Sequence, residues 1–114
     1  MKRYKKQYSV EETEQYYLKR MHNSSLSKNK RIYSSSWLEG FIDIHSKENI
    51  SDYQRRYKEI KDCGYGMMPG VEMMFTGYIN GAKARAKKKD ISHDREKYDE
   101  YHALAYKYNL RYSK

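Results

Sequence analysis

The sequence contains little of what usually builds a protein core or a covalent framework. Leu, Ile, Val and Phe together make up only 16 of its 114 residues, and it has one Cys and one Pro. A single Cys excludes an internal disulfide and a Cys-based zinc site. No apolar run approaches the roughly 20 residues that cross a bilayer, and no apolar segment follows the basic N-terminus as in a secretory signal. We therefore expect a cytoplasmic protein with no membrane contact.

Low aliphatic content together with 34% charged residues is typical of disordered chains. The 14 Tyr and 6 Met argue against disorder, because most of them recur at helical spacing. A chain of 114 residues has the size of one domain. We predict a mainly α fold, a compact bundle of about five helices in residues 9–114, preceded by a flexible basic arm in residues 1–8.

Three Ser residues each stand three positions before Glu or Gln, the spacing of a capping box that marks the start of a helix. They predict helices over about 10–22, 37–47 and 52–63. Residues 23–36, which are rich in Ser, Lys and Asn, are expected to form a loop with a short extended piece at 31–33. The three candidate boxes are Ser9–Glu12, Ser36–Glu39 and Ser51–Gln54.

The longest periodic stretch starts after Pro69, a residue that suits the first turn of a helix. Apolar side chains recur at offsets of 0, 3, 4, 7, 8, 11 and 15 from Val71, which predicts the central helix over about 70–89. Gly77 and Gly81 lie on a second stripe of small residues, although each interior Gly costs about 1 kcal/mol relative to Ala. We interpret this stripe as the contact with a neighbouring helix, and close approach of a ligand or a nucleic-acid strand is the alternative.

A last helix is predicted to begin at residue 90 or 92. Tyrosines and one Ala follow a 3-4-3-4 spacing along it, the pattern of a packed seam. The seam is either part of the core, which we favour because such a helix needs packing to persist, or a tyrosine-rich interface, for example of a homodimer. Its members are Tyr98, Tyr101, Ala105, Tyr108 and Tyr112.

Residues 37–46, WLEGFIDIHS, resemble the LAGLIDADG motif of homing endonucleases. The resemblance rests on Leu38, Gly40, Phe41, Ile42 and Asp43. It implies a helix that packs closely against a second copy of itself. The metal-binding carboxylate of that family falls on His45 here and its final glycine on Ser46, so the resemblance carries no nuclease chemistry over. Close helix packing at Gly40 is the expectation that remains.

The helices expected at 37–47 and 52–63 also suggest a helix-turn-helix with residues 49–51 as the turn. Arg55 and Lys58 would then occupy positions that are usually apolar, so a plain helical hairpin is the simpler interpretation.

Few side chains have the spacing of a catalytic or metal site. Two Asp–His pairs have i,i+3 spacing, but they lie too far apart on one helix to share an ion. No nucleotide-binding loop or nucleophile motif is present, so we expect no enzyme, no metal and no cofactor. The two pairs are Asp90–His93 and Asp99–His102.

Positive charge is the feature that points to a partner. The net charge of +9 gathers at the two ends of the sequence, with +6 in residues 1–33, −1 in 34–70 and +4 in 71–114. Cations contact phosphates and Tyr rings stack on bases, so basic clusters with nearby Tyr are typical of nucleic-acid surfaces. The candidate contact residues are Lys83, Arg85, Lys87, Lys88 and Lys89 in the central helix, Lys2, Arg3, Lys5 and Lys6 in the arm, Lys28, Lys30 and Arg31 in the expected loop, and the neighbouring Tyr4, Tyr8 and Tyr33.

Three hypotheses about function stay open. The first is a small non-enzymatic basic protein of phage or mobile-element type that binds nucleic acid or a ribonucleoprotein. The second is an inhibitor of a host defence system, similar to an anti-CRISPR protein, that occupies a binding site on a host protein through a protein–protein interaction. The third is a structural subunit of a homo-oligomer or larger assembly that associates through the tyrosine seam.

Overall fold

The computed structural model describes residues 9–43, 45–63, 68–87 and 95–110. These residues form five α-helices and no strand, which confirms the predicted mainly α bundle. In chain order the helices are α1 (Val10–His22), α2 (Lys28–Ile42), α3 (Ser46–Asp62), α4 (Pro69–Ala86) and α5 (Arg95–Lys107). No helix in this part of the chain combines the length and the apolar character that crossing a membrane requires. The predicted arm at residues 1–8 lies outside the described residues.

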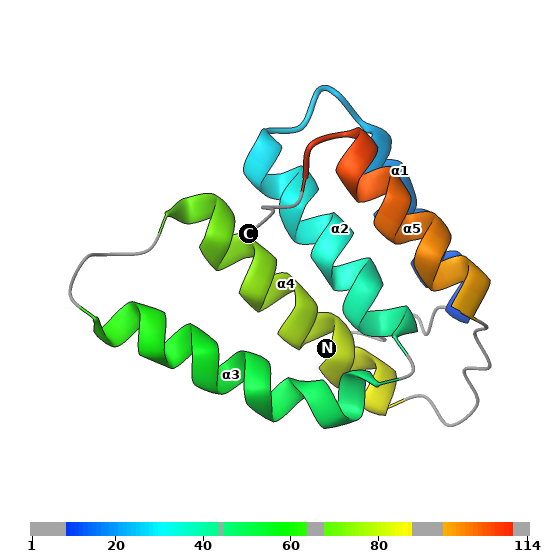
Figure 1. The fold of residues 1–114 in the computed structure, drawn as a ribbon. Helices are drawn as coiled ribbons and strands as arrows, with labels where there is room; N and C mark the ends of the chain where they lie inside the picture. The colour runs from blue at the N-terminus through cyan, green and yellow to red at the C-terminus, as the bar shows by residue number, and fades with distance from the viewer. Residues whose placement is uncertain (1–8, 44, 64–67, 88–94, 111–114) are drawn as a thin grey trace, which may run out of the picture.

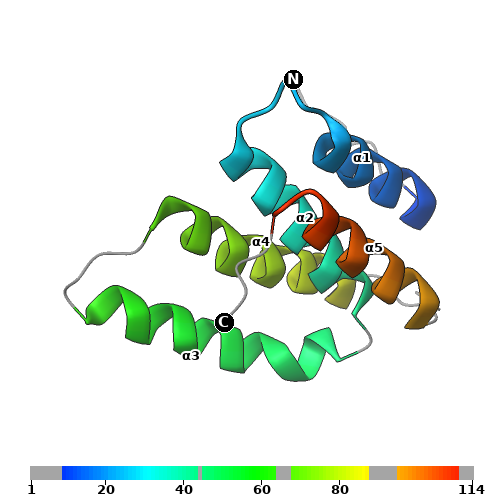
Figure 2. The ribbon, with the colours of Figure 1, turned by 45° about the horizontal axis from the view of Figure 1, so that its top comes forward.

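Helices α2 and α4 form the centre of the bundle, lie side by side and run in the same direction (Figure 1). Helices α1 and α5 cover the part of α2 that α4 leaves open, and α3 packs along the other side of α4 (Figures 1 and 2). The helix predicted as central is thus present as α4, and α2 shares its central position. Helix α4 ends at Ala86, so Lys88 and Lys89 lie beyond it and outside the described residues.

Three glycines explain how closely α2 and α4 approach. Gly40 on α2 and Gly77 and Gly81 on α4 lie where each helix meets the main chain of the other. A Cβ at Gly77 would stand 2.6 Å from the carbonyl oxygen of Tyr33, and a Cβ at either of the other two would come closer still to a main-chain carbonyl. This confirms that the glycine stripe is a helix contact. It also shows that Gly40 packs against a helix of the same chain.

The apolar core follows α2 and is closed by side chains of α1, α4 and α5. The tyrosine seam of α5 enters this core, since Tyr101 is only 4% exposed. Asn109 ends α5 in a left-handed conformation with φ of 57°, and Leu110 then donates its amide hydrogen to the Ala105 carbonyl at 2.8 Å. This turn returns the Leu110 side chain to the core. The favoured interpretation of the seam as core is therefore confirmed for Tyr101 and Ala105.

The predicted loop over residues 23–36 is right for 23–27 but wrong from Lys28 onward, where the expected extended piece at 31–33 is helical. Helix α2 already begins within it, because the hydroxyl of Ser27 accepts a hydrogen bond from the Lys30 amide at 3.3 Å and caps the helix. The three serines at 34–36 are weak helix formers. They are nevertheless fully buried where neighbouring helices approach α2, so tertiary packing of small side chains outweighs propensity.

Only one of the three predicted capping boxes is confirmed among the described residues, the one that joins Ser9 and Glu12. Ser36 is buried in the middle of α2, and Ser51 lies inside α3, which starts six residues earlier than predicted. Neither residue stands at a helix start, so neither can cap one. Matching residue types at the right spacing were not sufficient, because a Ser inside a helix, whether buried like Ser36 or exposed like Ser51, can produce the same pattern.

Helix α2 ends at Ile42, five residues before the predicted end, and the break before α3 falls at Asp43. The Asp43 carboxylate accepts a hydrogen bond from the His45 amide at 2.9 Å, which turns the chain and ends α2. The same carboxylate accepts the hydroxyl hydrogen of Tyr78 at 2.6 Å and so ties the turn to α4. Residues 49–51 lie inside α3. The helix-turn-helix interpretation, which needs them as its turn, is therefore wrong.

Candidate nucleic-acid interface

The predicted basic residues divide between the two ends of the central helix pair. Lys30 lies near the start of α2, and Lys83 and Lys87 lie at the end of α4. Since α2 and α4 run in the same direction with Trp37 level with Gly81, the two groups lie about 14–20 Å apart along the helix axes. Six further candidates are outside the described residues, namely Lys2, Arg3, Lys5, Lys6, Lys88 and Lys89.

Two predicted contact residues are engaged within the protein. Arg31 donates from Nε to the Met21 carbonyl at 2.9 Å and lies 5.4 Å from the centre of the Tyr108 ring. Arg85 donates from Nη1 to the Phe41 carbonyl at 3.0 Å, and burial lowers its pKa. These arginines hold helices together. The candidates that stay exposed and form no ion pair with a described residue are Lys28, Lys30, Lys83 and Lys87.

The exposed lysines belong to two stretches that contain no acidic residue. Neither 15–38 nor 73–89 contains a single Asp or Glu, although they carry five and five Lys or Arg residues respectively. Helix α3 differs, because acids and bases alternate along it. There Arg55 pairs with Asp52 and with Glu59 at 3.0 Å, and Arg56 pairs with Asp52 at 3.4 Å.

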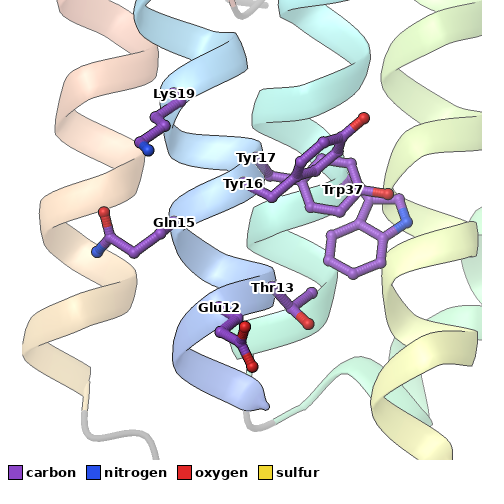
Figure 3. Close-up of a pocket in the computed structure, with 7 residues that line it drawn as sticks. All are labelled: Glu12, Thr13, Gln15, Tyr16, Tyr17, Lys19 and Trp37. Carbon is purple, nitrogen blue, oxygen red and sulfur yellow. The ribbon is translucent and has the colours of Figure 1, made fainter. Parts of the chain in front are cut away.

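The two acid-free stretches meet at an aromatic patch, which consists of Tyr16, Tyr17, Tyr33 and Trp37. The Tyr17 ring stacks on Trp37 with ring centres 3.8 Å apart, and Tyr16 meets Tyr17 edge-on at 5.0 Å. Figure 3 shows these three side chains together on the side of α1 that faces α4. Trp37 is 7% exposed and Tyr16 is 55% exposed, so the patch has a buried base and an open top.

A guanidinium group borders the patch on the α1 side. Arg20 lies 5.6 Å from the centre of the Tyr16 ring, and its Nε donates to the Ser34 hydroxyl at 3.2 Å. Burial, followed by the neighbouring Tyr33 and Tyr16, raises the pKa of Tyr17 to about 12, while Arg20 lowers it. The Tyr17 phenol is therefore neutral near pH 7. The patch offers neutral rings beside a cation.

Lysines border the patch at both ends. The Asn80 side chain of α4 donates to the Tyr33 hydroxyl at 2.9 Å, so this side of α4 faces the patch. Lys83 and Lys87 follow Asn80 by three and seven positions and lie on the same side of α4. Lys30 precedes Tyr33 by three positions on α2 and flanks the patch at the other end.

An open pocket lies against α1 next to the patch (Figure 3). Gln15 and Lys19 line it on the side toward α5, and the aromatic side chains line it on the side toward α4. Among the residues that line the pocket, Glu12 is the one with a carboxylate. This carboxylate accepts the Ser9 amide hydrogen at 3.1 Å in the capping box. The lining residues are Glu12, Thr13, Gln15, Tyr16, Tyr17, Lys19 and Trp37.

Two buried carboxylates bond α5 to the rest of the bundle. Glu14 of α1 is 2% exposed and accepts the Tyr101 hydroxyl hydrogen at 2.9 Å. Glu39 of α2 is 1% exposed and is hydrogen-bonded to Nδ1 of His102. Glu39, which we predicted to close a capping box with Ser36, is thus a partner of His102 instead. Among the described residues, no three metal-binding side chains gather, and the predicted Asp90–His93 pair lies outside them.

The sequence pointed to Tyr33 as a stacking residue but missed Tyr16, Tyr17 and Trp37. A single helix from Ser27 onward would have placed Tyr33 and Trp37 four positions apart on one face. The sequence did contain a sign of this helix, since Ser27 can cap a helix that starts at Lys28, but the Ser-rich composition of the segment indicated a loop instead.

No family model, no curated protein and no solved structure matches this chain. The chemistry of the described side chains is what bears on function. Exposed ammonium groups bind phosphate oxygens, and an exposed phenol ring can stack on a base.

Proposed function

We propose that the protein is a non-enzymatic binder of nucleic acid, free or within a ribonucleoprotein, and that it binds through the face formed by α1, α2 and α4. The observation that carries the proposal is the meeting of the two acid-free stretches at the aromatic patch. Lys30, Lys83 and Lys87 border open Tyr rings there, and none of the three forms an ion pair with a described residue. A net charge of +9 adds attraction to any polyanion.

The strength of this interaction depends on salt in a predictable way. Each lysine that neutralises a phosphate releases condensed counterions, and each contact adds about 0.7–0.9 to the slope of log K against log salt concentration. The three lysines around the patch therefore contribute about 2 to 3 to that slope. A binder that used another surface would not lose this contribution when these lysines are replaced.

The test is fluorescence anisotropy with short labelled DNA and RNA, over about 50 to 200 mM salt. Replacement of two lysines, Lys83→Gln/Lys87→Gln, should weaken binding at low salt and reduce the slope by about 1.5. The control Lys47→Gln/Lys58→Gln removes the same charge from exposed positions on α3 and should have a smaller effect. No binding to any nucleic acid at low salt would overturn the proposal, as would equal losses in the two double variants.

A further inference from the structure

One ring in the aromatic patch is exposed and is held in place by its neighbours. Tyr16 is 55% exposed, yet it is braced edge-on by Tyr17, which is itself stacked on the buried Trp37. Arg20 lies over the Tyr16 ring and is anchored to Ser34 of α2. A large aromatic side chain in this setting loses little conformational freedom when a ligand covers it, because its neighbours already restrict it.

The chemistry of this surface selects among forms of nucleic acid. Bases in a duplex stack on one another and present only their edges and the backbone. A base in a single strand has a free face, and every base has one, so an aromatic platform binds single strands with little dependence on sequence. Phosphates on either side of a base on Tyr16 would face lysines, since Lys30 borders the patch at one end and Lys83 and Lys87 at the other.

We infer that the aromatic patch is a stacking platform for single-stranded nucleic acid, with one base against the exposed ring of Tyr16 and the neighbouring phosphates on the bordering lysines. This inference rests on the proposed function, because it names the form of nucleic acid that the same face binds. A stacked base typically accounts for about 5- to 150-fold in affinity.

The experiment measures the affinity of the full chain for labelled oligo-dT, oligo-U and a mixed-sequence duplex of the same length. The wild-type protein should bind the single strands more tightly than the duplex. Tyr16→Ala should weaken binding of single strands about 10-fold and leave binding of the duplex unchanged, whereas Tyr16→Phe, which keeps the ring, should bind like the wild type. The oligo-dT and oligo-U arms show whether DNA or RNA is preferred.

A matched control is Tyr106→Ala on α5. Tyr106 is 51% exposed, close to the value for Tyr16, but it does not belong to the patch. The control should bind every probe like the wild type, and urea unfolding of each variant checks that the fold is retained. Binding of single strands that is unchanged in Tyr16→Ala, or weakened equally in Tyr106→Ala, overturns the platform, while the proposed function stands because the wild-type protein still binds nucleic acid. No binding of any probe overturns both.

Discussion

Helix α2 is held in two different ways on its two sides. Toward α4 the two main chains touch, because Gly40, Gly77 and Gly81 have no side chains to keep the helices apart. On the side of α1 and α5, apolar packing is combined with two almost fully buried carboxylates, Glu39 of α2 bonded to His102 of α5 and Glu14 of α1 bonded to Tyr101 of α5. The first kind fixes a distance and tolerates no addition. The second kind requires partners and tolerates replacement of both.

The aromatic patch lies where these two kinds of contact meet. Its α4 border, with Asn80 and Lys83, is positioned by the glycine contact. Its α1 border, with Tyr16, is positioned by ring stacking on Trp37 and by the bond from Arg20 to α2. Changes on the glycine side should therefore disturb the lysines, whereas changes at Glu39 and α5 should affect stability more than binding.

The largest effect is expected from Gly81→Ala. The added methyl group would overlap the main-chain carbonyl of Trp37, and no change of rotamer relieves this overlap. The free energy of unfolding in urea should fall by about 3 kcal/mol, even though Ala is the better helix former by about 1 kcal/mol. The control Ala103→Gly, at an exposed position of α5, should cost about 1 kcal/mol. Wild-type stability in Gly81→Ala would contradict main-chain contact.

A smaller effect is expected from His102→Ala. Glu39 would lose a hydrogen-bonding partner within the core, so the free energy of unfolding should fall by about 2 kcal/mol. The double variant Glu39→Leu/His102→Leu should recover most of this loss, because an apolar pair needs no partner. A double-mutant cycle by urea unfolding, with Glu39→Leu and His102→Leu as its single variants, measures the recovery. If the stability losses of the two single variants simply add in the double variant, Glu39 and His102 do not act as a pair, which would contradict this account of the α5 side.

Alkaline pH should weaken both sides of α2. Burial, reinforced by hydrogen bonds to carboxylates, raises the pKa of Tyr78 on the α4 side and of Tyr101 on the α5 side. Tyr in the unfolded chain ionises near pH 10, so above that pH the unfolded state binds fewer protons than the folded state. Stability should be constant below about pH 10 and fall above it, by at most about 1.4 kcal/mol per pH unit for each group.

The pH series compares Tyr78→Phe and Tyr101→Phe with the wild type by urea unfolding at about pH 9 to 11. Each variant should have a shallower decline above about pH 10, because the replaced group no longer titrates. Tyrosinate absorbance should appear together with unfolding for these buried residues. Parallel declines in all three proteins would contradict the assignment.

The smallest effect is expected from Arg55→Gln on α3. Its ion pairs with Asp52 and Glu59 are exposed, so solvent and salt screen them. The midpoint of urea unfolding should be unchanged within error. A clear loss of stability would show that α3 is more strongly coupled to the bundle than its exposed, ion-paired surface indicates.

The helices with a clear apolar stripe and a standard start could be predicted from the sequence. Ser9 with Glu12 placed α1, and Pro69 with the stripe from Val71 placed α4. Helix α2 could not be placed in the same way. Its serines at 34–36 read as a loop because their helix propensity is low, and only the neighbouring helices, which are distant in sequence, make burial of small residues favourable.

The candidate site was predictable in charge but not in shape. Lys83 and Lys87 were identified from composition, since they lie in a stretch without acids. The inward orientation of Arg85 and the stack of Tyr17 on Trp37 depend on how α1, α2 and α4 pack together. Local spacing does not determine that packing.

The most direct test is an amide chemical-shift titration of the labelled protein with short oligo-dT or oligo-U. The largest changes should fall on α1 around Tyr16 and Arg20 and on α4 around Asn80 and Lys83, with little change along α3. Shift changes that are centred on α3, or absent from the aromatic patch while the oligonucleotide is bound, would contradict the placement of the binding face between α1 and α4.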